Sequence, residues 1–151
     1  MMIARLLIPA TFLFASNLYA FPCYVTFVKN NCWTDYNVNL VLTEAITNKN
    51  LLNLTVLKGK SWVRGSFECE ARQKLKASAT FSPLIWETDA GKVYFAKNFI
   101  FLPDEIDPSQ SAWEVPICYP AAFTGVSLPP TAEGQCTCDF SVIPPIPPKK
   151  I

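Results

Sequence analysis

The residues in this chain whose spacing most resembles that of a chemical site are two cysteines separated by a single residue. Cys136 and Cys138 flank one threonine, and such a pair can act as a redox centre or hold a metal ion through its thiolates. A reactive thiolate needs a nearby cation or the start of a helix, and the neighbours Gly134, Gln135 and Asp139 supply neither. The pattern therefore favours two structural cysteines, each joining this segment to a different part of the core, over redox or metal chemistry.

The chain has six cysteines in all, and no metal or other cofactor is expected. An even number in an exported chain predicts up to three disulfides, formed in an oxidising compartment. Six cysteines allow fifteen pairings, and the sequence does not select one of them. The predicted disulfide cysteines are Cys23, Cys32, Cys69, Cys118, Cys136 and Cys138.

The sequence contains no histidine, which removes most familiar hydrolase mechanisms. Neither a Ser-His-Asp nor a Cys-His site can be built, and the commonest zinc ligand is missing. The five glycines are scattered, so there is no glycine-rich phosphate loop. We therefore expect a protein that is not an enzyme. The remaining enzymatic hypothesis uses carboxylates alone, with Glu68, Asp104 and Glu114 as the candidates.

Three carboxylates lie close together in one expected loop, at Asp104, Glu105 and Asp107. Oxygen ligands of this kind can hold calcium. Their spacing matches no known calcium loop, and Pro103 and Pro108 indicate a stiff, solvated turn. We predict the solvated turn.

Four basic and aromatic residues form the candidate binding surface, namely Lys58, Lys60, Trp62 and Arg64. Trp62 and Arg64 share the outward parity of one expected strand, and the two lysines precede it. Aromatic residues and arginine are favoured at contact surfaces, so this patch could bind a protein, a glycan or a lipid surface. The alternative is structural, with the tryptophan covering an edge of the core and Arg64 stacked on Trp62.

Residues 1–20 have the features of a secretory signal peptide. Arg5 is followed by a short apolar run over residues 6–15, and Ala20 is a small residue at a plausible cleavage point before Phe21. The run is too short to span a bilayer, and the mature chain contains no second candidate span. We expect an exported protein, either periplasmic or secreted.

Removal of this segment would leave about 131 of the 151 residues, a length typical of one domain. Arg5 is the only charged residue removed, so the remaining 12 basic and 12 acidic residues balance. A neutral chain lacks the basic excess that phosphate backbones require. Nucleic acid is therefore not an expected partner.

Apolar side chains recur at every second residue through most of residues 36–81, which is typical of strands with one buried and one exposed face. Tyr36, Val38 and Leu40 share one parity, and the same pattern points Cys69 inward, where a disulfide belongs. Residues 70–79 also fit a helical face, but we expect a strand there. The expected strands cover residues 23–28, 36–46, 52–56, 62–70, 74–81, 84–87, 92–102 and 113–118.

Short strands separated by turns in one exported domain predict an all-β fold. The specific prediction is an antiparallel, immunoglobulin-like β-sandwich over residues 21–120, stapled by disulfides.

Residues 121–151 form a proline-rich tail. Eight of the thirteen prolines lie in the last 36 residues, and proline cannot serve in a central strand. We expect the tail to be tethered by Cys136 or Cys138 and mobile after Pro144. Its end, Pro144 to Lys150, also has the composition of a segment that docks into an aromatic groove.

Several short motifs carry a resemblance to small exported proteins of intracellular gammaproteobacteria. They are Lys58-Gly59-Lys60-Ser61-Trp62, Phe67-Glu68-Cys69, Asp89-Ala90-Gly91-Lys92 and Ile117-Cys118-Tyr119-Pro120. The resemblance implies a periplasmic or secreted location and a role at the host interface, and it assigns no catalytic residues.

Three functional hypotheses follow from the sequence. The first is a non-enzymatic binding module that contacts a protein, glycan or membrane surface through the patch at Lys58, Lys60, Trp62 and Arg64. The second is a structural subunit or inhibitor in an envelope or secretion assembly, docked through its proline-rich tail. The third is the enzyme that uses carboxylates alone.

Overall fold

The computed structural model describes residues 21–148, and in this part the chain forms two β-sheets that share one core. The predicted all-β class is therefore confirmed. The predicted signal peptide, residues 1–20, lies outside the described residues. Within residues 21–148, no helix has the length and apolar composition needed to span a membrane.

The smaller sheet has three strands with β1 (Phe21–Lys29) at its centre, between β4 (Trp62–Cys69) and β8 (Trp113–Tyr119). β1 is antiparallel to β4 but parallel to β8, so the prediction of a wholly antiparallel fold is wrong for this pair. The loop over residues 102–112 brings the chain back to the end of the domain where β1 begins. β8 therefore starts opposite Cys23 and runs in the same direction as β1.

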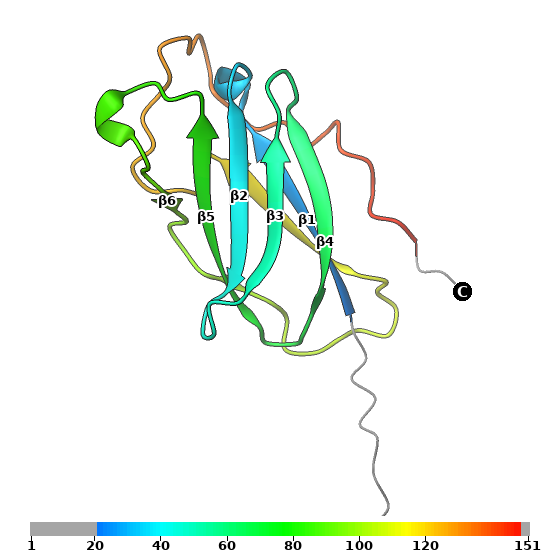
Figure 1. The fold of residues 1–151 in the computed structure, drawn as a ribbon. Coiled ribbons are helices and arrows are strands. Elements are labelled where there is room, and N and C mark those ends of the chain that lie inside the picture. Colours follow the sequence, from blue (N-terminus) through cyan, green and yellow to red (C-terminus); the bar gives the residue numbers. More distant parts are fainter. Residues whose placement is uncertain (1–20, 149–151) are drawn as a thin grey trace, which may run out of the picture.

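The larger sheet has the order β3-β2-β5-β6, with β7 also paired to β5, and all of its pairings are antiparallel. Figure 1 shows this sheet in front of β1. The alternating pattern correctly predicted its three long strands, including the segment that also fitted a helix. These are β2 (Asn37–Glu44), β3 (Asn50–Val56) and β5 (Lys74–Ser82).

Two predicted strands are wrong. Residues 84–87 contain no strand and lead into a short 3-10 helix, η2 (Glu87–Asp89). The long strand predicted over residues 92–102 is reduced to β6 (Tyr94–Phe95) and β7 (Ile100–Phe101). The reason lies in the backbone, because the N–H of Lys97 donates to the carbonyl oxygen of Ala122 at 2.8 Å. The chain thus leaves β5 between β6 and β7.

The core lies between the two sheets and is centred on aromatic rings. Trp33, at the end of the 3-10 helix η1 (Asn31–Trp33), packs edge-on against Tyr119 with ring centroids 5.1 Å apart. Cys69 is 2% exposed, as its inward parity predicted. Phe123 is also buried in this core, although it lies beyond residue 120, where the predicted sandwich ends.

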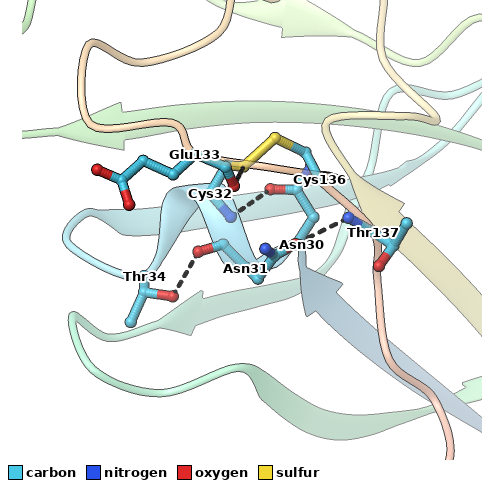
Figure 2. Close-up of a disulfide and its surroundings, with 7 residues drawn as sticks. All are labelled: Asn30, Asn31, Cys32, Thr34, Glu133, Cys136 and Thr137. Carbon is cyan, nitrogen blue, oxygen red and sulfur yellow. Dashed lines mark hydrogen bonds between the residues drawn. A yellow bond between two sulfur atoms is a disulfide. The ribbon is translucent and has the colours of Figure 1, made fainter.

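The three predicted disulfides are present, and they pair Cys23 with Cys69, Cys32 with Cys136, and Cys118 with Cys138. The first joins β1 to β4, and the other two join η1 and β8 to the segment after residue 120. The structural interpretation of the adjacent cysteines is therefore confirmed, since each is joined to a different part of the core. Figure 2 shows the Cys32–Cys136 bridge, beside which the N–H of Thr137 donates to Asn31 Oδ1 at 2.8 Å.

Candidate functional site

The structure places the four predicted surface residues on one corner of the domain, where β3 leads into β4. Lys58 and Lys60 are exposed in the turn between the strands. The turn is fixed by its backbone, because the N–H of Lys58 donates to Asn37 Oδ1 at 2.7 Å and the N–H of Gly59 donates to the carbonyl oxygen of Thr34 at 2.8 Å. Gly59 has a φ of +80°, which favours glycine at this position.

Arg64 is held inside a network and is not a free surface cation. Its Nε donates to Thr26 Oγ1 at 3.0 Å, and its Nη2 lies 3.1 Å from Glu114 Oε1. Its Nη1 donates to the carbonyl oxygen of Pro145 at 3.3 Å, and the side chain is only 12% exposed. The guanidinium also lies 5.9 Å from the centroid of the Trp62 ring, in the expected stacking contact. These contacts give Arg64 a structural role.

The end of the chain crosses the face of the small sheet that carries Trp62 and Arg64. Cys138 Sγ lies 3.5 Å from the carbonyl oxygen of Val28 in β1, and Pro145 contacts Arg64 further along. Because of this cover, Val28 is fully buried although it is on the outer side of β1. The proline-rich segment was expected to dock on another protein, but Pro145 within it contacts the small sheet of the same chain. Docking of this segment to another protein stays a prediction.

A second basic and aromatic surface, which the sequence analysis did not identify, lies along β6 and β7. Its side chains alternate as in a strand, with Tyr94 and Leu102 buried on one side. Phe95, Phe99 and Phe101 lie on the other side and are 54%, 46% and 70% exposed. Three large apolar side chains are therefore presented to solvent along one edge of the large sheet.

Two lysines of β5 lie against these rings. Lys74 is directly opposite Phe101 in the sheet register, and its Nζ lies 4.0 Å from the centroid of the Phe99 ring and 5.6 Å from that of Phe101. Lys76 Nζ lies 5.7 Å from the centroid of the Phe95 ring. Such distances are typical of cation–π contacts. We call these five residues the lysine–phenylalanine surface.

The positive charge of this surface has no acidic partner. Within residues 21–148, the salt bridges join Arg64 to Glu114 and Lys92 to Asp89, and neither Lys74 nor Lys76 takes part in one. Lys97, in the turn between β6 and β7, is exposed and adds a further cation. The surface is thus both apolar and basic.

The sequence gives a partial signal for this surface. Residues 92–102 are apolar on both parities, which is typical of a strand buried on both faces. Only the position of β6 and β7 beside β5 shows which side is covered. The exposure of the three phenylalanines was not predicted.

The carboxylates proposed for catalysis are dispersed. Glu68 lies on β4, Glu114 on β8 and Asp104 in the loop before it, and Glu114 is already bound by Arg64. In the same loop, the hydroxyl and backbone N–H of Ser109 donate to Asp107 and hold the pKa of that carboxyl below its usual value. The described residues contain no group of three or more acidic, cysteine or histidine side chains placed to hold a metal ion.

No family model, curated protein or solved structure matches this chain. Its function is therefore inferred from its own surfaces. On the predicted surface at Lys58, Lys60, Trp62 and Arg64, the guanidinium of Arg64 is bound within the protein and is not available to a partner. The lysine–phenylalanine surface keeps its rings exposed and its cations without an acidic partner.

Proposed function

We propose that the protein is an exported, non-enzymatic binding module with an immunoglobulin-like β-sandwich, which binds an anionic partner through the lysine–phenylalanine surface. Three disulfides in a small domain are typical of an oxidising compartment and support export, to the periplasm or beyond. Two sheets that share one core support the sandwich.

One observation carries the proposal, namely that three phenylalanine rings are about half or more exposed beside two lysines without acidic partners. Exposed apolar side chains that gather in one place usually mark an interaction site. The rings favour an apolar contact, and the ammonium groups favour negative charge. A partner that combines apolar groups with anionic ones would therefore use the whole surface.

The geometry also keeps the surface in one arrangement before binding. Lys74 lies over Phe99 and Phe101, while Lys76 lies over Phe95, so cross-strand contacts hold cations and rings together. Preorganised side chains lose less conformational entropy when a partner binds.

The test compares two matched double variants of the exported protein. Lys74→Gln with Lys76→Gln removes two charges from the lysine–phenylalanine surface, and Lys58→Gln with Lys60→Gln removes two from the corner at β3 and β4. Binding is measured to three anionic probes, namely phosphatidylglycerol vesicles, heparin and polyglutamate. We expect binding to at least one probe that the first variant loses and the second retains.

Two results would contradict the proposal. Binding lost in the Lys58 and Lys60 variant alone would assign function to the surface predicted from sequence. Absence of binding to all three probes would contradict the proposal of an anionic partner. Thermal unfolding of both variants, with masses showing no free thiols, controls for misfolding.

A further inference from the structure

We propose that the anionic partner is a phospholipid bilayer, with the phenylalanine rings entering the boundary between headgroups and acyl chains and the lysines contacting lipid phosphates. This inference rests on the proposed function and names the partner of the same surface. It is argued from the shape of the surface, the chemistry of its side chains and the placement of its charges.

The exposed rings form a ridge along the edge of the large sheet. Phe95 lies opposite Ser78 and Phe101 opposite Lys74, four residues apart on β5, which corresponds to roughly 13 Å. β5 is the one strand with which β6 and β7 pair in the described part of the chain, and Figure 1 shows β6 beside β5 at this end of the sheet. On its other side the backbone of β6 bonds to residues 122–124, where the N–H of Thr124 donates to the carbonyl oxygen of Phe95 at 2.9 Å. A ridge at an edge can meet a flat surface along its whole length.

Within the strands of the large sheet, the large apolar side chains that are exposed are Phe95 and Phe101, both at this edge. On β2 and β3 the same outer face carries polar side chains, among which Thr55 Oγ1 donates to Asn39 Oδ1 at 2.9 Å. On β5 the outer positions beside the ridge are Lys74, Lys76 and Ser78. The surface thus changes from polar to basic to apolar toward the edge, as expected for a protein that enters a membrane interface edge-first.

The side-chain chemistry favours lipid over carbohydrate. Phenylalanine has no polar atom, so its exposed ring gains most from an apolar environment such as the acyl region. A glycan needs several fixed hydrogen-bonding groups for orientation. Beside the three rings, this surface offers mainly the ammonium groups of its lysines.

The lysines are placed to act at the same depth as the rings. Lys74 Nζ lies 4.0 Å from the centroid of Phe99, so the ammonium group is held against that ring. A side chain of this kind can keep its charge among the headgroups while its stem follows the ring inward. Each lysine is attracted to the negative charge of anionic lipid headgroups. Together with the apolar contact of the rings, this attraction would give reversible membrane binding.

Acidic residues lie on both sides of the segment that carries the ridge. Lys92, before β6, is engaged with Asp89 at 4.0 Å. The exposed carboxylates Asp104 and Glu105 follow β7. Lys74, Lys76 and Lys97, together with the exposed Arg72 two residues before Lys74, are the cations near the ridge on which membrane attraction depends.

The experiment is co-sedimentation of the exported protein with vesicles of equimolar phosphatidylglycerol and phosphatidylcholine, and with vesicles of phosphatidylcholine alone. We expect binding to the anionic vesicles and little to the neutral ones. Lys74→Gln with Lys76→Gln should weaken binding about 25-fold, from roughly fivefold for each lysine. Phe95→Ser with Phe101→Ser should weaken it at least as much, although no charge changes.

The corner at β3 and β4 supplies matched controls. Leu57 lies there next to Lys58, and its exposed fraction of 58% is close to the exposed fraction of Phe95. Leu57→Ser, and Lys58→Gln with Lys60→Gln, should leave vesicle binding unchanged. Equal loss in these controls would show that vesicles bind any basic or apolar patch, and would overturn the inference.

Other outcomes separate this inference from the proposed function. Heparin or polyglutamate binding that depends on Lys74 and Lys76, without vesicle binding, would overturn the membrane inference and keep the binding module. Absence of binding to every probe would overturn both. Self-association that Phe95→Ser with Phe101→Ser abolishes, without vesicle binding, would assign the ridge to a second copy of the chain.

Discussion

Arg64 and Glu114 lie on strands that are not neighbours, yet Nη2 of the first and Oε1 of the second are 3.1 Å apart. β1 runs between their strands, and the pair meets above Thr26 of β1. The Thr26 hydroxyl accepts from Arg64 Nε at 3.0 Å and donates to Glu114 Oε1 at 3.2 Å. The three residues therefore join all three strands of the small sheet on its outer face.

We predict that Arg64→Ala lowers the free energy of unfolding by about 2 kcal/mol, because a mostly covered guanidinium loses three hydrogen bonds. Glu114→Gln keeps the shape and should lower it by about 1 kcal/mol. Urea unfolding measures both. Lys92→Gln is the control, since its exposed 4.0 Å pair with Asp89 should contribute less than about 0.5 kcal/mol. A loss in the control as large as that of Arg64→Ala would contradict this prediction.

We predict that Tyr119→Phe preserves or raises stability. The hydroxyl of Tyr119 is buried and has no hydrogen-bond partner within residues 21–148, and burial raises its pKa well above the ordinary value. Removal of an unpaired buried hydroxyl ends its desolvation cost, about 1 kcal/mol or more, while the ring contacts to Trp33 and Phe123 remain. Thermal unfolding measures the change, and a clear loss of stability would show that the hydroxyl is bonded.

Lys29 predicts how stability depends on pH. Its side chain is buried, and Nζ donates to the carbonyl oxygens of Tyr36 at 2.5 Å and Leu57 at 2.9 Å. Burial lowers its pKa from 10.5 to about 8, an effect that the nearby charge of Asp35 partly opposes. Between these two pH values the unfolded chain holds a proton that the folded protein has released. Stability should therefore rise from pH 8 to pH 10.5 and be lowest, as far as this group is concerned, below pH 8.

The measurement is the midpoint of urea unfolding at several pH values in this window. Lys29→Met should abolish the rise, whatever its effect at neutral pH. Lys58→Met, at an exposed lysine, should keep it. A rise of equal size in Lys29→Met would assign the pH dependence to another group.

The two tail disulfides should differ in their contribution to stability. Cys32 and Cys136 are 104 residues apart and Cys118 and Cys138 are 20 apart. In the chain-entropy account, a long closed loop restricts the unfolded state more, so the losses should be about 4.7 and about 3 kcal/mol. Paired Cys→Ser variants compared by urea unfolding test this order. A larger loss for the shorter loop would show that native contacts of the tail outweigh loop entropy.

The sequence predicted the parts of the fold that are encoded locally. Alternation placed β2, β3, β4 and β5, and it gave Cys69 its inward orientation. It also assigned Arg64 to the outer face of the small sheet. These features depend on residues two apart in the chain, which is the range that a periodic pattern reports.

Features that depend on distant segments were not predictable in this way. The strand expected over residues 92–102 is interrupted because Lys97 bonds to Ala122, and nothing near Lys97 in the sequence indicates that partner. The same holds for the cover over Arg64, which comes from Pro145, and for the choice among fifteen disulfide pairings. The lysine–phenylalanine surface was missed for this reason, since exposure of Phe95 depends on what lies beside β5.

The spans of the three disulfides overlap along the chain, running from Cys23 to Cys69, from Cys32 to Cys136 and from Cys118 to Cys138. Every peptide bond between Cys23 and Cys138 is therefore enclosed by at least one covalent ring. A protease that cleaves once anywhere in this interval releases no fragment, because the two pieces stay joined through sulfur. A single cut in this interval thus leaves the chain covalently connected, which no hydrogen bond or packed side chain can ensure.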